Sequence, residues 1–596
     1  MIKERLKELR ALMKNHGINA YLLISTDPHQ NEYLPPYWDR CRFISGFTGT
    51  YCRIIITDKE TMMWTDGKEE LKVKKDLKKT PYKYYVKELV TADLRMEIEW
   101  LAEKLPRNSV LGIDPQTVTV TQMDALKELL NNKGIKVKYT DPNLIDLLWE
   151  KRPTLSQSAI VFRDKKYEPV SAVEKIKKLQ KIMKEKGTDV HVISNLESIA
   201  RLLNVRGNDI EYTPLVISYL IVTLDQVLWF VNKKRIKDLE HVTANIIAFD
   251  YEDFAKILKN ITEKRTVLVD TNEISQWIMN NISPSAKIVK ETSPLITFKG
   301  IKTEKELKHI IHANIKDSIS LIKTIHWIKN NVGKKKITEW DVAQKIVEFK
   351  KEGKVFIDLS FGSTVAYGKN AAIIHYSAQP DNSSVIKNKG MLLLDAGGNY
   401  LDGTSDITRT ISVGETTKEM KESYTMVLKG HLSLGQAKFP KGTRGYHLDV
   451  LARRPIWDKG FNFYHGTGHG VGYCTCVHET SGIGISPLKV AILDEGMVLT
   501  NEPGYYKAGH YGVRIENCIY VAKNSHLTKI NGKNTVLEFK ELTMCPYEKT
   551  LIEKNILTKQ EIEWINNYHC LVFKTLKAHI KDKKILAWLK DACATI

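Results

Sequence analysis

An order of helix followed by strands occurs twice in the first half of this chain, and it restricts the fold more than any other sequence feature. In the first copy, apolar residues recur at helical spacing over 2–13, and apolar, β-branched strands follow over 20–24 and 53–57. In the second copy, a helix is predicted over 172–186, with strands over 190–193 and 215–224. Alternating helices and strands are typical of α/β domains. We therefore predict two α/β domains with a duplicated fold, although their side chains show little identity.

The remainder of the chain forms a third segment with a different pattern. A long helix predicted over 304–330 opens it, after a change of pattern near Ser293. The chain has 596 residues, which suits about three to five domains at about 100–200 residues each. We place the domains at 1–152, 153–298 and 299–596, and the fold class is α/β (α+β).

Charge and cysteine content exclude several classes of protein. The net charge is +20, but the basic stretches 72–79 and 334–336 are short, far apart and without interleaved aromatics, so we expect no nucleic-acid partner. The apolar stretch 214–231 is interrupted by Asp225 and Gln226, which argues against a membrane span. Eight scattered cysteines form no disulfide framework, and the first helix is amphipathic rather than a signal sequence. We predict a cytoplasmic protein with reduced thiols.

Two aspartates in the third segment stand where a carboxylate needs a partner. Asp395 ends a buried-strand pattern over 390–395, where an unpaired carboxylate is unfavourable. The turn at Asp402 and a returning strand over 404–412 bring Asp406 back towards it. Two close carboxylates repel each other unless a cation lies between them. The alternative is that each is an N-cap or turn aspartate.

A glycine-rich loop with two histidines lies further along. It is His465–Gly472 (HGTGHGVG), after an aromatic run over 461–464 with a strand-like pattern. A phosphate-binding loop is the rival interpretation, but the Lys-Ser/Thr ending and a following helix are missing. With His478 nine residues beyond His469, the spacing favours metal and proton chemistry.

Two more carboxylates accompany strands near residue 500. Glu502 ends a strand over 498–502 at a Pro-Gly turn, and a strand over 512–520 places Arg514 and Glu516 on one face. An ordinary ion pair between Arg514 and Glu516 is the alternative. The whole set is oxygen-rich and suits Mn, Co, Fe or Zn. Because four negative charges exceed what one divalent ion balances, we predict two metal ions. The members of this set are Asp395, Asp406, His469, Glu502 and Glu516.

Four ordered motifs resemble those of the aminopeptidase P family, the three-domain Xaa-Pro aminopeptidases with a pita-bread catalytic domain. They are Leu394–Thr410 (LDAGGNYLDGTSDITRT), His465–Gly472, Asn501–Tyr506 (NEPGYY) and Arg514–Asn517 (RIEN). Weaker matches lie at 27–33, 43–47, 64–67, 203–209 and 564–569, so the resemblance spans nearly the whole chain. It implies two creatinase-like N-terminal α/β domains followed by the pita-bread domain.

The resemblance also implies roles for individual residues. The five residues of the set would be the metal ligands, with Asp406 and Glu516 bridging two ions; Mn²⁺ is the expected metal, with Zn²⁺ and Co²⁺ as alternatives. His375, His465 and His478 fall where the family has its non-ligand active-site histidines, and Arg514 where it has an arginine. The sequence departs from the family pattern at 49–52, at 68–70 and in the thiols Cys474 and Cys476, which we interpret as small buried side chains.

The predicted activity is removal of the first residue from peptides with proline in second place. Our hypothesis is attack by a hydroxide held by both metals, with Glu502 as the proton acceptor and His375 or His478 stabilising the oxyanion. The family suggests a homodimer. Alternatives are a prolidase restricted to dipeptides and, in another class, a non-catalytic binding protein with the pita-bread fold.

Overall fold

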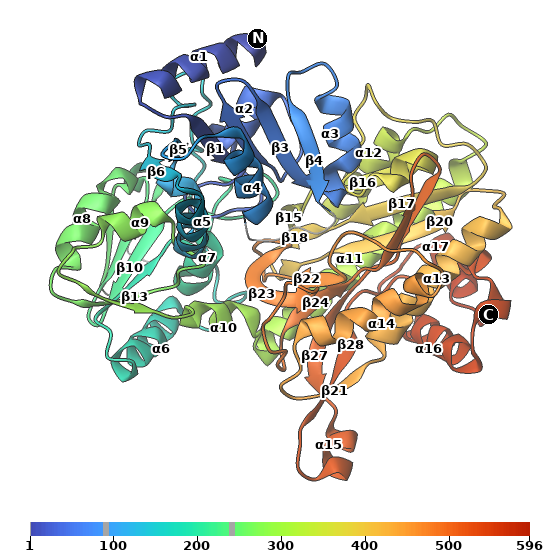
Figure 1. Ribbon diagram of the computed structural model, residues 1–596. Coiled ribbons are helices and arrows are strands. Elements are labelled where there is room, and N and C mark those ends of the chain that lie inside the picture. Colours follow the sequence, from blue (N-terminus) through green and yellow to red (C-terminus); the bar gives the residue numbers. More distant parts are fainter. Residues whose placement is uncertain (1, 88–93, 238–244) are drawn as a thin grey trace. The chain divides into compact units, whose positions relative to one another are not determined.

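The structure is a computed structural model that describes residues 2–87, 94–237 and 245–596 (Figure 1). It divides into two compact units, which we call unit 1 (Met1–Ile296) and unit 2 (Thr297–Ile596).

Unit 1 contains two six-stranded sheets. The first has the strand order β4-β3-β2-β1-β5-β6. Its strands are β1 (Ala20–Ile24), β2 (Arg53–Thr57), β3 (Thr61–Asp66), β4 (Lys83–Lys87), β5 (Val110–Ile113) and β6 (Lys136–Tyr139), and its helices are α1 (Ile2–Asn15), α2 (Arg40–Ser45), α3 (Glu70–Asp76), α4 (Arg95–Lys104) and α5 (Val120–Lys133). Leu6, Leu9 and Met13 are the buried face of α1, as its helical spacing predicts.

The second sheet has the order β12-β11-β10-β8-β13-β14. Its strands are β8 (Val190–Ile193), β10 (Tyr219–Thr223), β11 (Val227–Phe230), β12 (Ile246–Phe249), β13 (Thr266–Val269) and β14 (Lys287–Lys290). Its helices are α6 (Ala172–Glu185), α7 (Leu196–Leu203), α8 (Phe254–Ile261) and α9 (Gln276–Asn281), and β7 (Val161–Phe162) pairs with β9 (Val205–Arg206) beside it. The strand predicted over 215–224 is shorter in the structure, since only β10 pairs with neighbours.

The two sheets share one topology. In the first sheet, the central strand β1 pairs antiparallel with β2 and parallel with β5. In the second sheet, β8 has the same place and pairs antiparallel with β10 and parallel with β13. The outermost pairs, β3 with β4, β11 with β12, β5 with β6 and β13 with β14, are all parallel. The duplicated fold predicted from the helix and strand order is therefore confirmed.

A buried histidine joins the two halves of unit 1. His29 is 1% exposed, and its Nδ1 lies 2.9 Å from the Ser194 carbonyl oxygen and its Nε2 2.9 Å from the Tyr251 hydroxyl. Burial lowers the pKa of His29 to about 4, so the ring is neutral at pH 7. His29 is thus a structural contact between the two domains of unit 1.

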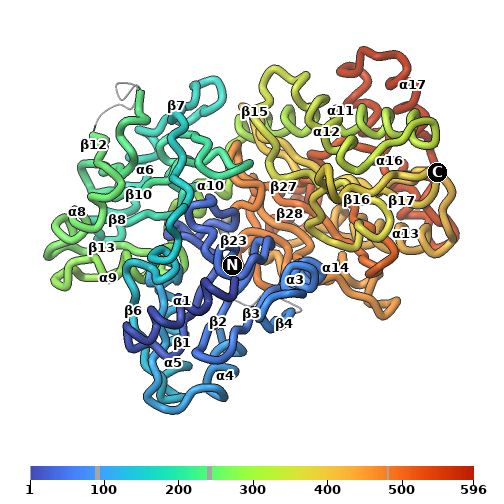
Figure 2. Tube along the Cα trace, turned by 90° about the horizontal axis from the view of Figure 1, so that it is seen from above, coloured from blue at the N-terminus to red at the C-terminus, as the bar shows by residue number. Residues whose placement is uncertain are grey.

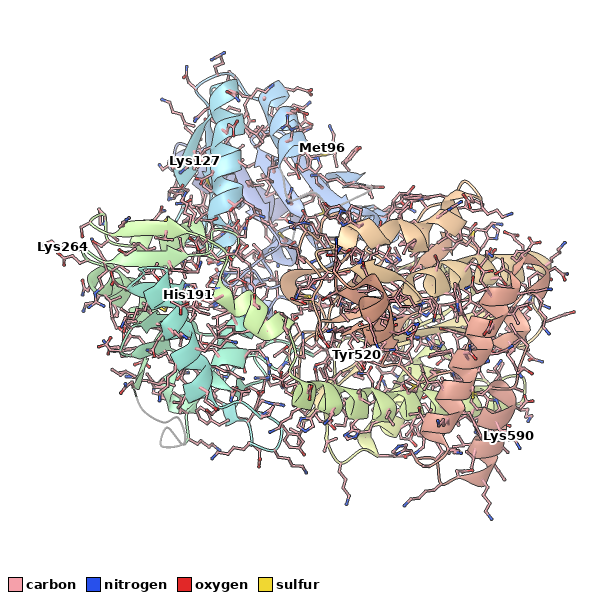
Figure 3. All side chains as sticks on the ribbon, turned by 90° about the horizontal axis from the view of Figure 1, so that it is seen from below. Met96, Lys127, His191, Lys264, Tyr520 and Lys590 are labelled. Carbon is pink, nitrogen blue, oxygen red and sulfur yellow. The ribbon has the colours of Figure 1, made fainter. Side chains whose placement is uncertain are left out.

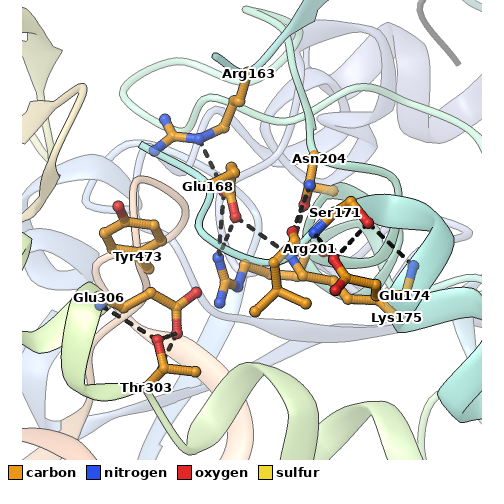
Figure 4. A network of polar contacts seen from close by, with 12 residues as sticks. Arg163, Glu168, Ser171, Glu174, Lys175, Arg201, Asn204, Thr303, Glu306 and Tyr473 are labelled. Atoms are coloured by element: carbon orange, nitrogen blue, oxygen red, sulfur yellow. Dashed lines mark hydrogen bonds and ion pairs between the residues drawn. The ribbon is translucent and has the colours of Figure 1, made fainter. Parts of the chain in front are cut away.

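Unit 1 also holds a carboxylate surrounded by cations. Glu168 is 3% exposed, and Figure 4 shows the side chains of Arg163 and Arg201 directed towards it. Arg163 Nε lies 2.9 Å and Lys175 Nζ 3.2 Å from its carboxylate oxygens, and Arg206 is also within ion-pair distance. Burial alone would raise the pKa of Glu168, but the cations, led by Arg201, lower it to about 2.

Unit 2 is built around the long helix α11 (Glu304–Asn331), which begins at a capping box formed by Thr303 and Glu306. The other helices are α12 (Glu339–Lys351), α13 (Lys418–Gly435), α14 (Gly445–Trp457), α15 (Ser525–Asn531), α16 (Lys559–Leu576) and α17 (Lys583–Ala592). Figure 2 shows α11 and α12 side by side, in agreement with their contacts. The helix predicted over 304–330 is confirmed.

The strands of unit 2 form several small sheets and one of six strands. One sheet joins β15 (Phe356–Leu359), β18 (Gly398–Tyr400) and β19 (Gly403–Thr404), and a second has the order β16 (Thr364–Tyr367), β17 (Met391–Ala396) and β20 (Ile407–Ser412). β25 (Gly504–Lys507) pairs with β26 (Tyr511–Arg514). The six-stranded sheet has the order β21-β28-β27-β24-β22-β23. Its strands are β21 (Lys438–Pro440), β22 (Gly468–Gly470), β23 (Glu479–Ile485), β24 (Val498–Asn501), β27 (Asn517–Lys523) and β28 (Val536–Glu541).

Part of the positive charge lies on exposed lysines in both units. Figure 3 shows Lys264 of unit 1 and Lys590 of unit 2 projecting outward, and both are exposed. By contrast, His191 lies in the interior of its sheet. Of the helices that the structure describes, none combines the length and apolar character needed to cross a membrane.

Candidate metal centre

Two adjacent strands bring the first two aspartates together. Asp395 lies in β17, and Asp406 comes directly before β20. These strands are antiparallel, with Ala396 opposite Ile407 and Asp395 opposite Thr408. The strand predicted over 404–412 is interrupted at 405–406, which frees Asp406 from the ladder. The approach of the two carboxylates predicted from the turn at Asp402 is confirmed, because both contribute oxygens to one group of close ligand atoms.

The glycine-rich loop supplies the histidine. His469 lies in β22, and Gly470 pairs with Leu499 of β24. A Cβ on Gly468 would lie 2.0 Å from the Thr500 carbonyl oxygen, so only glycine permits this approach of β22 to β24. The aromatic run 461–464 forms no strand in the structure, contrary to its pattern. Its buried member, Phe463, instead packs in the core of unit 2.

Glu502 lies one residue beyond the end of β24. Its backbone N–H donates to the Thr467 carbonyl oxygen over 2.8 Å, so strand β24 and the glycine-rich loop are fastened together at this point. Thr500 adds two more contacts: its Oγ1 accepts from the His469 N–H at 3.0 Å and donates to Glu502 Oε1 at 3.2 Å.

Glu516 and Arg514 lie at a break between two strands. The continuous strand predicted over 512–520 is wrong: β26 ends at Arg514 and β27 begins at Asn517. The alternative of an Arg514–Glu516 ion pair is also not what the structure shows, because Arg514 pairs with Asp395. The Thr408 hydroxyl lies between the two side chains. It donates to Glu516 Oε2 at 2.7 Å and accepts from Arg514 Nε at 3.2 Å.

The five side chains of the predicted ligand set converge. Potential ligand atoms lie within 4.8 Å of one another in three overlapping groups. The groups are Asp395, Asp406 and Glu516; His469, Glu502 and Glu516; and Asp406, His469 and His478. Every predicted ligand belongs to at least one group. His478, which the family resemblance makes a non-ligand residue, is in van der Waals reach of His469, with ring centroids 4.3 Å apart.

Burial, together with repulsion within the cluster, raises the pKa of three of its acids. Burial, followed by the charges of Glu516, Asp395 and Glu502, raises the pKa of Asp406 well above its usual value. Burial and the charges of Glu502 and Asp395 do the same for Glu516. Burial raises the pKa of Glu502 to about 7 despite the opposing effect of Arg514. One guanidinium does not neutralise four carboxylates, so the site has room for further positive charge.

The orientation of His469 indicates where that charge belongs. Its Nδ1 lies 3.0 Å from the Gly470 carbonyl oxygen and must carry the proton that this hydrogen bond requires. Nε2 faces Asp406 Oδ2 at 3.4 Å and Glu502 Oε1 at 3.5 Å. A ring nitrogen placed between two carboxylates suits either a proton or a metal ion at that position. Asp395 Oδ1 is buried and has no hydrogen-bond partner. The residues therefore fit a site for divalent ions.

Comparison with known proteins agrees with this chemistry. Residues 308–523 match the metallopeptidase family M24, residues 5–147 and 151–306 match creatinase/prolidase N-terminal domains, and residues 535–596 match the C-terminal region of peptidase M24. A probable Xaa-Pro aminopeptidase P of Laccaria bicolor is 35% identical over 100% of this chain and 93% of its own length. The chain belongs to the aminopeptidase P group of metallopeptidase family M24.

Other members of this family extend the comparison. Xaa-Pro aminopeptidase 1 of Dictyostelium discoideum is 34% identical over 99% of this chain and 96% of its own length. The crystal structure of X-prolyl aminopeptidase from Caenorhabditis elegans, described as a cytosolic enzyme with a di-nuclear active site, matches with a TM-score of 0.94 and 31% identity over 100% of both chains. An Xaa-Pro dipeptidase from Bacillus anthracis matches 63% of this chain, with a TM-score of 0.51 and 25% identity. The M24 pita-bread domain and the two creatinase-like domains expected from the sequence are confirmed.

A chain of hydrogen bonds leads away from the M24 carboxylates, and it includes a residue to which the sequence assigned no role. Arg514 donates to Asp395 and, at 2.8 Å, to the Tyr506 hydroxyl oxygen. His465 Nδ1 lies 2.8 Å from the Gly466 carbonyl oxygen, and its Nε2 lies 2.9 Å from that same hydroxyl. The Tyr506 hydroxyl therefore joins Arg514 to His465. The sequence marked Tyr506 only as a member of the motif Asn501–Tyr506, and Thr408 only as a residue of a predicted strand.

His375 and the thiols Cys474 and Cys476 are the remaining residues named from the sequence. His375 follows the short helix η7 (Gly368–Ala372) and is half-buried, but it belongs to none of the close ligand groups found among the described residues. Cys474 is buried and Cys476 half-buried, and the eight cysteines, each within the described chain, form no disulfide bond. Cys474 has a φ of +51°, a left-handed conformation that is uncommon outside glycine, at the tight turn where Gly472 N–H donates to the Cys476 carbonyl oxygen.

Proposed function

We propose that this protein is a metal-dependent Xaa-Pro aminopeptidase, which removes the N-terminal residue from peptides with proline in second position. The observation that carries the proposal is the convergence of four carboxylates and Nε2 of His469 at one site. The full-length relatives named Xaa-Pro aminopeptidase support the choice of substrate.

Five residues would hold two divalent ions in this proposal: Asp395, Asp406, His469, Glu502 and Glu516, with Asp406 and Glu516 shared between the two. The di-nuclear site described for the Caenorhabditis elegans enzyme supports the number of ions. Mn²⁺ is our choice of metal because the family resemblance suggests it, and the oxygen-rich donor set, which also suits Co, Fe and Zn, is compatible with it. When bound, such ions lower the pKa of water and polarise a peptide carbonyl.

The protein's own groups then move protons and hold charge. Glu502 is the proposed proton acceptor, because its carboxylate lies among the proposed ligands, with Oε1 3.5 Å from His469 Nε2. Tyr506 and Arg514 fix the ring of His465, which is 7% exposed beside Glu502. His375 and His478 are the proposed donors to the oxyanion of the tetrahedral intermediate, a role in which one contact contributes about 2.7–4 kcal/mol.

Preference for proline follows from the chemistry of the scissile bond. The bond before proline is a tertiary amide without an N–H, so a site that grips that N–H cannot recognise it. The alternative of a dipeptide-restricted prolidase is less well supported, because the dipeptidase from Bacillus anthracis matches only 63% of this chain. The alternative of a non-catalytic binding protein requires an intact carboxylate cluster to persist without use, which is unfavourable.

We further propose a cytoplasmic homodimer. The location is supported by the description of the Caenorhabditis elegans enzyme as cytosolic. The oligomeric state is supported by the outer face of α14, where Tyr446, Val450 and Trp457 are 39%, 44% and 47% exposed. Exposed apolar side chains at helical spacing are typical of protein–protein contacts. Light scattering of the purified protein gives the mass that tests this point, and a monomer at all concentrations would contradict it.

The activity is tested with the purified, metal-stripped protein and three peptides. Arg-Pro-Pro is incubated with and without added Mn²⁺, and Ala-Ala-Ala and the dipeptide Ala-Pro serve as controls. We expect Mn²⁺-dependent release of arginine and little cleavage of Ala-Ala-Ala. Cleavage of Ala-Pro alone would indicate a prolidase, and no turnover with Mn²⁺, Zn²⁺ or Co²⁺ would overturn the proposal in favour of a binding protein.

A further inference from the structure

The inner face of α14 carries a buried ion pair that the proposed chemistry does not use. Asp449 and Arg453 are 4% and 3% exposed, and Arg453 Nε donates to Asp449 Oδ2 at 2.7 Å. They are four residues apart and so lie on one side of the helix. A buried ion pair rarely adds much net stability, since both charges lose their hydration. The other hydrogen bonds of Asp449 and Arg453 therefore indicate the role of the pair.

Those hydrogen bonds all go to the segment that carries His465. Arg453 Nη1 donates to the Phe463 carbonyl oxygen and Nη2 to the His465 carbonyl oxygen, both at 2.7 Å. The guanidinium also lies over the Phe463 ring, 4.0 Å from its centroid. On the acid side, the Thr467 hydroxyl donates to Asp449 Oδ1 at 2.6 Å. Residues 463, 465 and 467 are thus each fixed by one pair of side chains on α14.

This segment has direct contacts with the candidate metal centre. Thr467 is fully buried, and its carbonyl oxygen accepts the Glu502 N–H at 2.8 Å. His465 Nδ1 lies 3.9 Å from Glu502 Oε2, and the Phe463 and His465 rings are 4.8 Å apart. A shift of 463–467 would therefore move the His465 ring relative to Glu502. Loops of this kind, which lack a strand ladder of their own, depend on side chains for their position.

We propose that Asp449 and Arg453 are positioning residues, which hold His465 and Thr467 in the register with Glu502 that the reaction requires. Arginine suits this role because its planar fork reaches two carbonyls and a carboxylate at once, whereas a lysine ammonium does not. The inference rests on the proposed aminopeptidase activity, although the placement of the loop can be measured without it.

The main test compares Arg453→Lys with Arg454→Lys. Arg454 is the adjacent residue, is exposed and has only a long contact with Asp458, so it is a matched control. Arg453→Lys keeps the charge beside Asp449 but loses the fork. We expect kcat for Arg-Pro-Pro to fall about 10- to 100-fold with KM nearly unchanged, because a misplaced group lowers reaction rate more than binding. The control should equal the wild type, and equal kcat values for both variants would overturn the proposal.

A double-mutant cycle identifies the group through which Arg453 acts. In a His465→Ala background, Arg453→Lys should lower kcat much less than in the wild type, because coupled residues are not additive. An undiminished loss would mean that Arg453 supports only folding. If Arg453→Lys does not fold, Thr467→Val and Thr467→Ser replace it. Only serine keeps the hydroxyl, so kcat should fall more in the valine variant, and equal values would contradict the role of Asp449.

A spectroscopic readout separates this inference from the activity itself. NMR spectra of protein with ¹⁵N-labelled histidine give the His465 Nδ1–H resonance, which is assigned by its loss in His465→Gln. We expect this resonance to shift or broaden in Arg453→Lys and to stay unchanged in Arg454→Lys. Absence of peptide cleavage by the wild type would refute the proposed function alone. An unchanged resonance in Arg453→Lys would refute the positioning role alone.

Discussion

Glu168 in unit 1 and Asp406 in unit 2 are both buried carboxylates, yet their surroundings have opposite charge. Arg201, Lys175 and other cations lower the pKa of Glu168 to about 2. Burial and three neighbouring carboxylates raise the pKa of Asp406 well above its usual value. The chain neutralises the first acid with its own side chains and leaves the second group largely uncompensated, with Arg514 as a countercharge.

This difference separates a structural site from a binding site. A buried acid that is fully paired within the chain contributes to the fold and needs nothing from solution. A cluster of acids that repel one another lowers the stability of the metal-free fold, and bound cations remove that repulsion. The protein therefore gives up part of its folding stability in order to bind metal. The following predictions, in decreasing order of expected effect, test whether the two regions differ in this way.

Asp406→Asn should abolish activity while leaving the fold intact. The amide removes one of the proposed shared ligands and also part of the repulsion, so the metal-free variant should be at least as stable as the metal-free wild type. Release of arginine from Arg-Pro-Pro with Mn²⁺ measures activity, and thermal unfolding in EDTA measures stability. Asp381→Asn, at an exposed position of the same unit, is the control and should change neither. An active Asp406→Asn enzyme would contradict the ligand assignment.

Glu168→Gln should have the reverse effect and destabilise unit 1. The amide leaves Arg163, Arg201 and Arg206 buried without their shared carboxylate, and breaking such a pair costs about 3–5 kcal/mol. Chemical denaturation gives the free energy of unfolding. Glu174→Gln is a matched control from the same region of Figure 4, where Glu174 caps α6 at an exposed position. Similar losses in both variants would show that burial of Glu168 among cations has no special importance.

Thr408→Val should weaken metal binding about 10- to 100-fold, the usual effect of removing a group that orients a ligand. Valine has nearly the same shape but neither donates to Glu516 nor accepts from Arg514. Calorimetric titration with Mn²⁺ measures the dissociation constant. Thr408→Ser keeps the hydroxyl and should bind more tightly than the valine variant, so the idea fails if serine and valine weaken binding equally.

The two regions should also respond to pH in opposite directions. Glu168 has a lowered pKa, so its contribution to stability is complete above pH 4.5 and is lost as the pH falls towards 2. Glu502 has a pKa raised to about 7, so the metal-free centre becomes less stable as the pH rises from 4.5 through 7. Unfolding of metal-free wild type and Asp406→Asn between pH 5 and 8 measures the second effect. The wild type should lose more stability than the variant over this range, and identical pH dependence would refute it.

The sequence predicted the architecture because local patterns and a family resemblance agreed. The apolar spacing of Leu6, Leu9 and Met13 gives α1, and the order of elements gives the shared topology of the two sheets in unit 1. The convergence of Asp395 and Asp406 followed from the strand and turn between them, since an antiparallel pair brings such positions together.

The sequence did not predict where strands break or which distant groups meet. The alternating strand pattern continued through Arg514 and Glu516 and so predicted one strand. In the structure β26 ends and β27 begins there, because β26 pairs with β25 and β27 pairs with β24. The contacts of Thr408 with Glu516 and of Arg453 with His465 depend on tertiary packing, which no local pattern encodes. The aromatic run 461–464 resembled a strand, but its backbone is held by Arg453 instead of a ladder.

The central claim is that the carboxylate cluster holds two divalent ions. The most direct test is elemental analysis of metal-stripped protein after dialysis against Mn²⁺, with Arg-Pro-Pro release measured on the same samples. The account predicts close to two Mn²⁺ per chain, with activity rising as the sites fill, and fewer ions bound to Asp406→Asn. Full activity in the stripped protein, or no Mn²⁺ retained by the wild type, would contradict it.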